Sequence, residues 1–340
     1  MFLSLQSSCG VALNRQINGV SQTHRRRGKI VSKFNEYLQG NTRRLAHYHH
    51  SIWETDVIES LSTPYTYELF APRLEELKGN AKCLLASNNK DSGVLLRLAS
   101  TMQRLGVAYH FEKEIEEALA LLYPNLTSNL YTTALQFRVL REHGFSISSA
   151  DQQVRQSLEI PLYWRMQRVE ARNFIDVYQR DMAKNLTLLE LARLDFNLVQ
   201  YVYQQELKDL ARWWRDLGFK DKLPFSRDRL MENYLWAMGM IFEPQFSKCR
   251  IGNTKFVCIL LAIDDMYDIY GSLDELESFT DAVDRTLSRW NVKAMEDLPQ
   301  YMKICYVAML NYVDEVVFDV IKDQDLDTFP YILEVVRNLK

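Results

Sequence analysis

The amino-acid sequence predicts an all-α fold. Long segments carry apolar residues at the i, i+3, i+4 spacing of a helix with one buried face, and alternating strand patterns are hard to find. Only 12 Gly and 8 Pro interrupt the 340 residues, so long helices can continue without a break. Hydrophobic residues make up 47% of the chain, enough for large buried cores. We therefore expect a globular helical protein of two domains.

Composition disfavours several classes of protein. A formal net charge of −3 provides no overall basic surface for nucleic acid. No apolar run approaches the ~20 residues that span a bilayer. The five cysteines are odd in number and scattered, which favours reduced thiols over a disulfide framework: Cys9, Cys83, Cys249, Cys258 and Cys305. We expect a monomer without a membrane span or a nucleic-acid partner.

The first 42 residues have the composition of a targeting segment. The first acidic residue is Glu36, whereas Lys, Arg and Ser recur before it. Such basic, serine-containing, acid-poor stretches are typical of organelle transit peptides. A plain disordered basic tail remains the alternative, and a secretory signal is disfavoured because no long apolar segment follows the N-terminus. We predict that residues 1–42 are a disordered, removable transit peptide.

The central feature of the sequence is an apolar run that leads into three carboxylates. Residues 256–263 are all apolar, and Asp264, Asp265 and Asp268 follow. On a helix these spacings place all three acids toward one side, where they repel one another. Mg²⁺ or Mn²⁺ would offset that repulsion and leave coordination sites for phosphate oxygens. The alternative is a solvated acidic turn at a helix end, but the preceding run is too hydrophobic for a surface face and favours a cavity.

Two arginine pairs are candidate phosphate ligands. Arg227 and Arg229 flank Asp228, and this two-residue spacing suits a loop or a helix terminus better than one helix face. The guanidinium fork donates two hydrogen bonds to phosphate and stays charged at any working pH. A surface salt bridge through Asp228 is the equal alternative. Arg43 and Arg44 could likewise bind phosphate or lie on a solvated surface.

Several segments, in order and spacing, resemble plant class I terpene synthases of the monoterpene type. The resemblance covers nearly everything after residue 42, and the ordered set is far more specific than any one motif. Its parts are Arg43-Arg44 followed after eight residues by Trp53, then LSTPYTY at 61–67, FSRDR at 225–229, ENYLW at 232–236, FEP at 242–244 and DDMYDIYG at 264–271.

The resemblance implies two helical domains, both incomplete. Residues 43–154 correspond to part of the N-terminal domain and residues 155–340 to part of the metal-binding catalytic domain. The family places further helices between segments that here follow one another directly, at 146–154 and 158–164. A second metal motif, Asn or Asp with Ser or Thr four on and Glu eight on, is also expected. The nearest match is Asp284 with Ser288, but residue 292 is Val.

The reaction that the resemblance implies is metal-dependent ionisation of a prenyl diphosphate to an allylic cation. Asp264 and Asp268, with Asp265 beside them, would hold Mg²⁺ or Mn²⁺. Arg227 and Arg229 would neutralise the diphosphate. Aromatic rings would stabilise the cation, and part of the N-terminal segment would form a lid that excludes water. The rings are Trp236 and either Tyr267 or Tyr270, and the lid residues are Arg43, Arg44 and Trp53.

Geranyl diphosphate is the expected substrate, a monoterpene the product and the plastid the location. An isoprene-type synthase acting on a five-carbon diphosphate remains an alternative. A chain-elongating prenyltransferase usually needs a second DDxxD, and this sequence has one. A non-catalytic remnant that binds diphosphate or pairs with an intact homologue also stays open. Without the second metal motif, fewer metal ions could be bound around the diphosphate, so we expect little cyclase activity from this chain.

Residues 1–42 fused to a fluorescent reporter should direct it to plastids, because the segment is basic and lacks acids before Glu36. The matched control replaces Arg25, Arg26 and Arg27 with Glu and should abolish import. Confocal microscopy of leaf cells provides the measurement. Purely cytosolic fluorescence of the unaltered fusion would show that the segment is not a targeting peptide.

Overall fold

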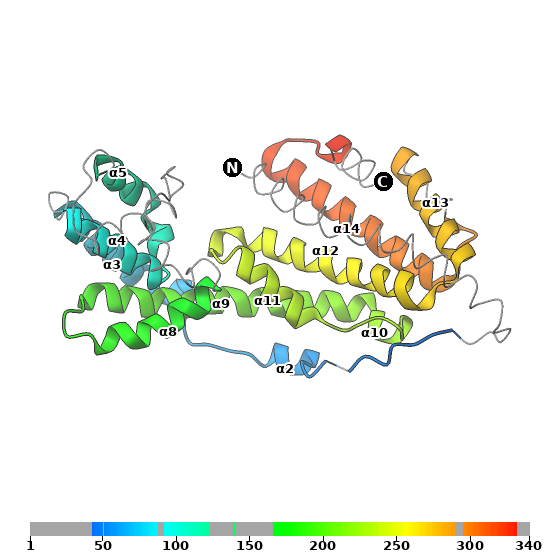
Figure 1. Ribbon diagram of the computed structural model, residues 1–340, viewed down its shortest axis with the longest axis horizontal. Helices are drawn as coiled ribbons and strands as arrows, with labels where there is room; N and C mark the ends of the chain where they lie inside the picture. Colours follow the sequence, from blue (N-terminus) through cyan, green and yellow to red (C-terminus); the bar gives the residue numbers. More distant parts are fainter. Residues whose placement is uncertain are drawn as a thin grey trace, which may run out of the picture. The chain divides into compact units, whose positions relative to one another are not determined.

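The fold is known from a computed structural model that describes residues 43–49, 51–87, 92–122, 139, 166–289 and 295–331. These residues form helices and turns without a strand, which confirms the all-α prediction. The proposed transit peptide and the junction at 146–164 lie outside the described residues. The helices (Figure 1) are α2 Thr55–Glu59, α3 Tyr67–Ser87, α4 Ser92–Arg104, η1 Ala108–His110, α5 Glu112–Leu122, α8 Gln167–Arg180, α9 Leu186–Leu217, α10 Phe219–Lys222, α11 Leu230–Met240, η3 Pro244–Phe246, α12 Ser247–Asp265, the π-helical turn η4 Met266–Tyr270, α13 Leu273–Arg289 and α14 Gln300–Gln324.

The chain divides into two compact units. The first, here called the α9 unit, lies within 51–217 and 229–258. The second, the α13 unit, takes its described residues from 43–49, 218–228 and 259–331. The division does not follow the boundary predicted at 154/155, because α3 and α4 pack against α9 and α8, respectively. The predicted boundary itself falls outside the described residues and stays a prediction.

The long helix α9 organises its unit. Asn185 caps it by accepting a hydrogen bond from the Leu188 amide at 3.1 Å, and the left-handed Gly218 follows its end. Its 32 residues extend about 48 Å at 1.5 Å per residue. Toward its N-terminus, α9 shares one hydrophobic core with α3, α4, α5 and α8. Toward its C-terminus it shares a second core with α2 and α11. The apolar stripe of one helix therefore connects both cores.

A buried polar cluster joins the N-terminal helices to α8 and α9. Asp195 of α9 is 1% exposed, and its Oδ1 accepts a hydrogen bond from the Tyr109 hydroxyl and lies 2.8 Å from His110 Nε2. Its Oδ2 lies 3.4 Å from Nη1 of Arg168 on α8, which also donates to the Gly106 carbonyl at 3.3 Å. A buried charge without its partner typically costs about 3–5 kcal/mol. This cluster therefore makes the packing of η1 against α8 and α9 specific.

The α13 unit has a core between α13 and α14. Phe279 and Tyr306 pack edge to face with ring centroids 6.2 Å apart, and the Tyr306 hydroxyl donates to the Ala282 carbonyl at 3.3 Å. Met302 and Cys305 are fully buried on the same half of α14. Burial raises the pKa of the Cys305 thiol to about 12, so this cysteine stays protonated and unreactive at neutral pH.

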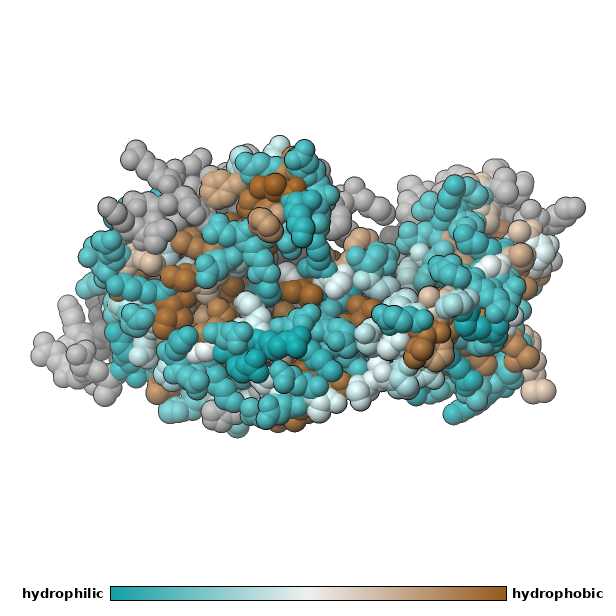
Figure 2. Space-filling view, turned by 180° about the vertical axis from the view of Figure 1, so that it is seen from behind, coloured by the Kyte–Doolittle hydropathy of each residue, from teal (hydrophilic) through white to brown (hydrophobic). Residues whose placement is uncertain are grey.

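Apolar side chains also reach the surface. No residue from 311 to 324 in α14 is buried, although this half of the helix includes Phe318, 66% exposed, and Ile321, 42% exposed. Figure 2 shows hydrophobic residues among hydrophilic ones on one face of the molecule.

Two further expectations concern the cysteines and the membrane. The four cysteines among the described residues, Cys83, Cys249, Cys258 and Cys305, are free thiols, as predicted. No helix in the described part of the chain has both the length and the apolar content needed to cross a membrane.

Gly106 ends α4 in a conformation that other residues rarely adopt. Its φ is +75°, and its amide and that of Val107 bond back to the carbonyls of Gln103 and Met102, the pattern of a Schellman cap. A Cβ built on Gly106 would lie 2.8 Å from the Cβ of Ala171 on α8. The turn therefore needs glycine for both its backbone angle and its close approach to α8.

Gly106→Ala should lower the free energy of unfolding by about 2–4 kcal/mol, from the left-handed backbone and the steric overlap together. Gly79→Ala is the matched control, because Gly79 lies within α3 and a methyl group added there would meet nothing within 4 Å. It should be stabilising by about 0.5–1 kcal/mol. Urea unfolding followed by circular dichroism measures both. Similar changes in the two variants would contradict the assignment of Gly106.

Candidate functional site

The three carboxylates lie where α12 gives way to the π-helical turn η4. Asp264 and Asp265 are the last residues of α12, and Asp268 lies within η4. The Gly271 amide donates to the Met266 carbonyl at 2.8 Å, an i to i+5 bond that closes the π turn. Short π segments inside or beside α-helices are frequent at functional sites.

The carboxylates do not all face one side, so that part of the prediction is wrong. Asp264 and Asp268 are exposed, whereas Asp265 is completely buried. Consecutive residues on a helix point about 100° apart, which turns Asp265 into the protein when Asp264 faces outward. Partial burial and then the charge of Asp268 raise the pKa of Asp264, and Arg227 partly opposes this shift. Asp264 and Asp268 therefore form an exposed, mutually repelling pair.

Arg227 binds the two adjacent aspartates at once. Its backbone amide donates to Asp265 Oδ2 at 2.8 Å, and its Nε donates to Asp265 Oδ1 at 2.9 Å. Its Nη2 lies 2.7 Å from Asp265 Oδ1 and 2.9 Å from Asp264 Oδ2. The predicted phosphate ligand is thus held against the carboxylates, with its side chain 29% exposed.

Tyr48 completes the surroundings of Asp265. Its hydroxyl donates to Asp265 Oδ1 at 3.0 Å, and the Arg227 guanidinium lies 5.3 Å from the centre of its ring. Burial, and then the hydrogen bond to the carboxylate, raise the pKa of Tyr48. Both oxygens of Asp265 accept hydrogen bonds from protein groups, so this residue anchors Arg227 and Tyr48.

Arg43 makes a second attachment of the N-terminal segment. Its Nη1 and Nη2 lie 3.0 and 2.7 Å from the two carboxylate oxygens of Glu275 in the first turn of α13. The Tyr301 hydroxyl donates to Glu275 Oε2 at 2.9 Å and accepts from Arg43 Nη1 at 3.2 Å. The guanidinium also lies 4.7 Å from the ring centre of Tyr270 and 5.0 Å from that of Tyr301. Residues 43–48 are therefore held at both ends.

Aromatic packing fixes the rings around Arg43. Tyr270 stacks on Phe225 with centroids 4.2 Å apart and meets Tyr301 edge-on at 5.0 Å. The Tyr270 ring, one candidate for cation stabilisation, thus already contacts a cation of the protein. Tyr267, the other candidate, forms a hydrogen bond of 2.8 Å with Thr280 and is 39% exposed.

The remaining sequence-predicted residues are Arg44, Arg229, Trp236 and Trp53. Arg44 is exposed. Arg229, Trp236 and Trp53 belong to the α9 unit, not to the unit that holds the carboxylates. Arg229 precedes α11 and lies 3.8 Å from Glu232, while Trp236 and Trp53 are 49% and 43% exposed.

Sequence reasoning missed Tyr48, Glu275, Tyr301 and Phe225. Tyr48 lies among histidines that indicate only a polar surface, and Tyr301 follows the carboxylates by more than 30 residues without a motif. One sequence signal could have indicated Glu275, because acids are favoured in the first turn of a helix. In the structure, Glu275 also accepts a hydrogen bond from the Ser272 amide at 3.1 Å.

The exposed aspartates fit a magnesium ion that is shared with a substrate. Within the described ranges, no group of three or more His, Cys, Asp or Glu side chains could hold a metal ion. Mg²⁺, however, usually binds through only one or two carboxylates, with waters and substrate phosphates completing its octahedron. Asp264 and Asp268 offer two such carboxylates with a hydrogen-bonding arginine beside them.

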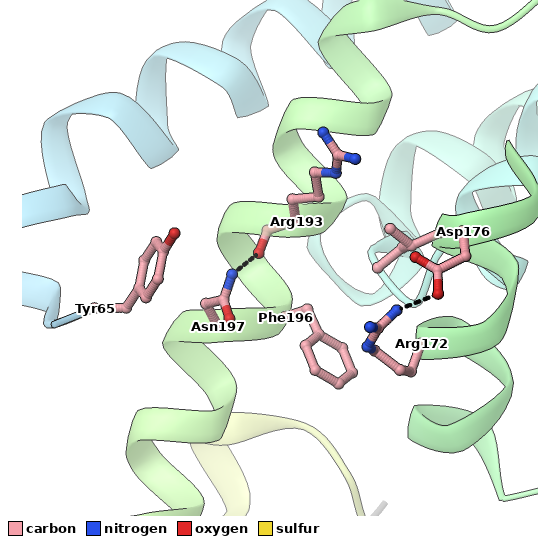
Figure 3. A pocket seen from close by; sticks show the side chains of 7 residues that line it. Tyr65, Arg172, Asp176, Arg193, Phe196 and Asn197 are labelled. Atoms are coloured by element: carbon pink, nitrogen blue, oxygen red, sulfur yellow. Dashed lines mark hydrogen bonds and ion pairs between the residues drawn. The ribbon is translucent and has the colours of Figure 1, made fainter. Parts of the chain in front are cut away.

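A pocket of about 330 Å³ in the α9 unit is distinct from this cluster. Its labelled side chains come mainly from α8 and α9, and Arg172 and Asp176 pair with each other at 2.7 Å (Figure 3). Asn197 donates to the Arg193 carbonyl at 2.9 Å within α9. None of the predicted site residues lines the pocket, which is bounded by Tyr65, Arg172, Ile175, Asp176, Arg193, Phe196 and Asn197.

Comparison with known sequence families gives two matches. Residues 52–153 match the family described as "Terpene synthase, N-terminal domain", and residues 215–340 match "Terpene synthase family, metal binding domain". A gamma-terpinene synthase of Citrus limon, labelled chloroplastic, is 35% identical over 97% of this chain and 68% of its own length. The chain belongs to the terpene synthase family. The second match contains Arg227 and all three aspartates, whereas Arg43 and Tyr48 precede both matches.

Other terpene synthases are similar over most of the chain. A protein of Ricinus communis named "Probable terpene synthase 9" is 50% identical over 89% of this chain and 62% of its own length. Its alignment covers 367 positions, more than the 340 residues of this chain, so some positions of the relative stand opposite gaps here. The chain thus spans about three fifths of the length of this curated relative.

Solved structures of terpene synthases share the fold. A limonene synthase with 2-fluorolinalyl diphosphate has a TM-score of 0.78 at 32% identity, over 86% of this chain and 67% of that one. An isoprene synthase from grey poplar, in complex with three Mg²⁺ ions and a dimethylallyl thiolodiphosphate, has a TM-score of 0.69 at 33% identity, over 83% and 65%. The family resemblance read from the sequence is thereby confirmed.

Glu275 should remain ionised well below its ordinary pKa of 4.5. The hydrogen bonds from Arg43, and then those from Ser272 and Tyr301, lower its pKa to about 2 although partial burial opposes them. A depressed pKa means that the ion pair stabilises the folded segment fully above about pH 4.5 and loses this effect as pH falls toward 2. The Glu275 carboxyl carbon, assigned with Glu275→Gln, should not titrate by NMR between pH 5 and 3.

Arg43→Ala should bring the Glu275 titration into that window, whereas Arg44→Ala, which removes the adjacent exposed arginine, should leave it outside. Titration of Glu275 near 4.5 in the unaltered chain would contradict the Arg43 attachment.

Proposed function

We propose that this protein is a terpene synthase that ionises a prenyl diphosphate in a magnesium-dependent reaction, with geranyl diphosphate as substrate and a monoterpene as product. The observation that carries the proposal is the exposed pair Asp264 and Asp268 beside Arg227, within the segment that matches the family's metal-binding domain. Relatives named as ocimene and gamma-terpinene synthases support a monoterpene product.

Asp264 and Asp268 would hold the metal. When bound, Mg²⁺ supplies Lewis-acid stabilisation for the charge that develops on the departing diphosphate. Arg227 would donate hydrogen bonds to the diphosphate beside the metal. Its Nη2 contacts Asp264, and its Nε is held by the buried Asp265. A donor that is already oriented needs little reorganisation when the carbon–oxygen bond breaks. Arg229 would add a second positive charge, and Trp236 an aromatic face for the allylic cation.

The N-terminal segment would exclude water from the reactive cation. Arg43 and Tyr48 attach it to Glu275 and to Asp265, and Tyr48 contacts the same carboxylate as Arg227. Capture of the cation by water competes with cyclisation, so a cover over the carboxylates would protect the cation until it cyclises. Arg44 and Trp53 belong to the same proposed lid, although both are exposed here. Plastid localisation is proposed because several relatives are labelled chloroplastic.

An isoprene-type synthase is the second candidate, because the grey poplar enzyme, solved with a dimethylallyl thiolodiphosphate, shares the fold. A remnant that binds diphosphate without turnover is the third, because positions of the relatives stand opposite gaps in this chain. The described residues include no complete three-ligand metal group to decide between them.

Metal binding tests the carboxylate assignment without requiring turnover. Mn²⁺ titrations followed by electron paramagnetic resonance, with and without inorganic diphosphate, should show binding that diphosphate strengthens. Asp264→Ala should weaken it at least tenfold, because one of two carboxylate ligands is lost. The matched control Asp274→Ala removes an exposed acid from the first turn of α13 and should bind as the unaltered chain does. Equal binding in both variants would refute the metal role of Asp264.

Substrate assays distinguish the three candidates. The full chain is incubated with Mg²⁺ and either geranyl or dimethylallyl diphosphate, and volatiles are measured by gas chromatography. Monoterpenes above a no-enzyme control support the proposal and would show that the expected loss of cyclase activity is wrong. Isoprene from the five-carbon substrate supports the second candidate. Diphosphate-dependent Mn²⁺ binding without either product would assign the chain to the third.

A further inference from the structure

Helix α11 has an unusual pattern for a short surface helix. Its eleven residues are mostly apolar on every side: Asn233, Tyr234 and Ala237 are buried, yet Leu235 and Trp236 are about half exposed. Hydrophobic burial therefore does not by itself select which face packs against α9. Directional polar contacts are needed to decide it.

Such contacts begin with a buried ion pair. Arg250 in α12 is completely buried, and Glu206 in α9 is 2% exposed. Arg250 Nε and Nη2 lie 2.9 and 2.6 Å from the two oxygens of Glu206, a bidentate arrangement. The Tyr234 hydroxyl of α11 donates to Glu206 Oε2 at 2.7 Å. One carboxylate of α9 thus binds side chains from both α11 and α12.

The same groups hold the backbone that follows α11. Arg250 Nη1 donates to the carbonyls of Ile241, at 3.3 Å, and of Glu243, and its Nη2 lies 3.5 Å from the carbonyl of Pro244. The carbonyl that remains in this run, that of Phe242, accepts from the Tyr203 hydroxyl of α9. The backbone carbonyls of four consecutive residues, 241–244, therefore accept hydrogen bonds from buried side chains. These bonds fix the conformation of the backbone directly after α11.

We propose that Glu206, Arg250, Tyr203 and Tyr234, here called the α11 clamp, are positioning residues that select the rotation of α11 in which Trp236 stays exposed. A rotation by about 100° in the direction that buries Trp236 would exchange exposed and buried apolar side chains, and it would also turn the exposed Glu232 toward the protein. It would also break the Tyr234 bond and leave the buried charge of Glu206 less satisfied, which opposes it. The clamp thereby fixes which ring α11 presents.

The inference rests on the proposed function only for the chemical role of Trp236. The position of the ring is a property of the α9 unit, to which α11 and all four clamp residues belong. It can therefore be measured without metal or substrate.

Fluorine NMR of the full chain labelled with 5-fluorotryptophan provides the test. Trp236→Phe identifies the Trp236 resonance. Tyr234→Phe and Tyr203→Phe each remove one hydroxyl of the clamp and keep the ring. In both, the Trp236 resonance should shift by more than its linewidth, and its solvent isotope shift between H₂O and D₂O should change. Arg250→Met should have a larger effect, but it leaves Glu206 buried without its charge partner and can prevent folding, so the conclusion depends on the tyrosine variants.

Tyr178→Phe is the matched control, because the Tyr178 hydroxyl also bonds to backbone in the α9 unit, accepting from the Asn185 amide at 2.8 Å. It should leave the Trp236 resonance in place. An unchanged Trp236 resonance in both clamp variants, or an equal shift in Tyr178→Phe, would overturn the proposal. Neither result bears on whether the protein ionises a prenyl diphosphate, so the two proposals can fail independently.

Discussion

The buried carboxylate of Asp265 is the constraint on which the candidate site depends. A fully buried charge is tolerated only when opposite charge and hydrogen bonds compensate for lost water. Here Arg227 supplies the charge and two of the hydrogen bonds, and Tyr48 supplies a third. Because the backbone amide of Arg227 takes part, the arginine side chain and its loop are placed together. The exposed neighbour Asp264 then shares the same guanidinium.

The three acids therefore differ in their structural roles. Asp265 faces inward and orients the arginine, whereas Asp264 and Asp268 face outward and keep their oxygens within reach of solvent and ligand. Burial, and then the charge of Asp268, raise the pKa of Asp264, so the two exposed carboxylates repel each other. A cation at this position would relieve that repulsion, so electrostatics favours the same chemistry that the family assignment implies.

Buried acids recur along α9 with a similar purpose. Asp195 is surrounded by Tyr109, His110 and Arg168, and Glu206 by Tyr234 and Arg250. Each acid joins helices distant in sequence, and each arginine partner is almost fully buried. Apolar contacts favour packing of these helices on α9, but such contacts still form when a helix slides or rotates. The charged contacts oppose sliding and rotation, because an unpaired buried charge costs far more free energy than an imperfect apolar fit.

Sequence patterns by themselves determined the helical fold, the family and the placement of the aspartates at the end of an apolar helix. These conclusions depend on local periodicity and on ordered motifs, which are properties of the chain. Tertiary structure alone decided that Asp265 turns inward, that Arg227 binds both Asp265 and Asp264, and that Glu275 and Tyr301 receive Arg43. Spacing on one helix cannot decide these outcomes, because the partners lie up to about 260 residues away and are selected by packing that brings distant segments together.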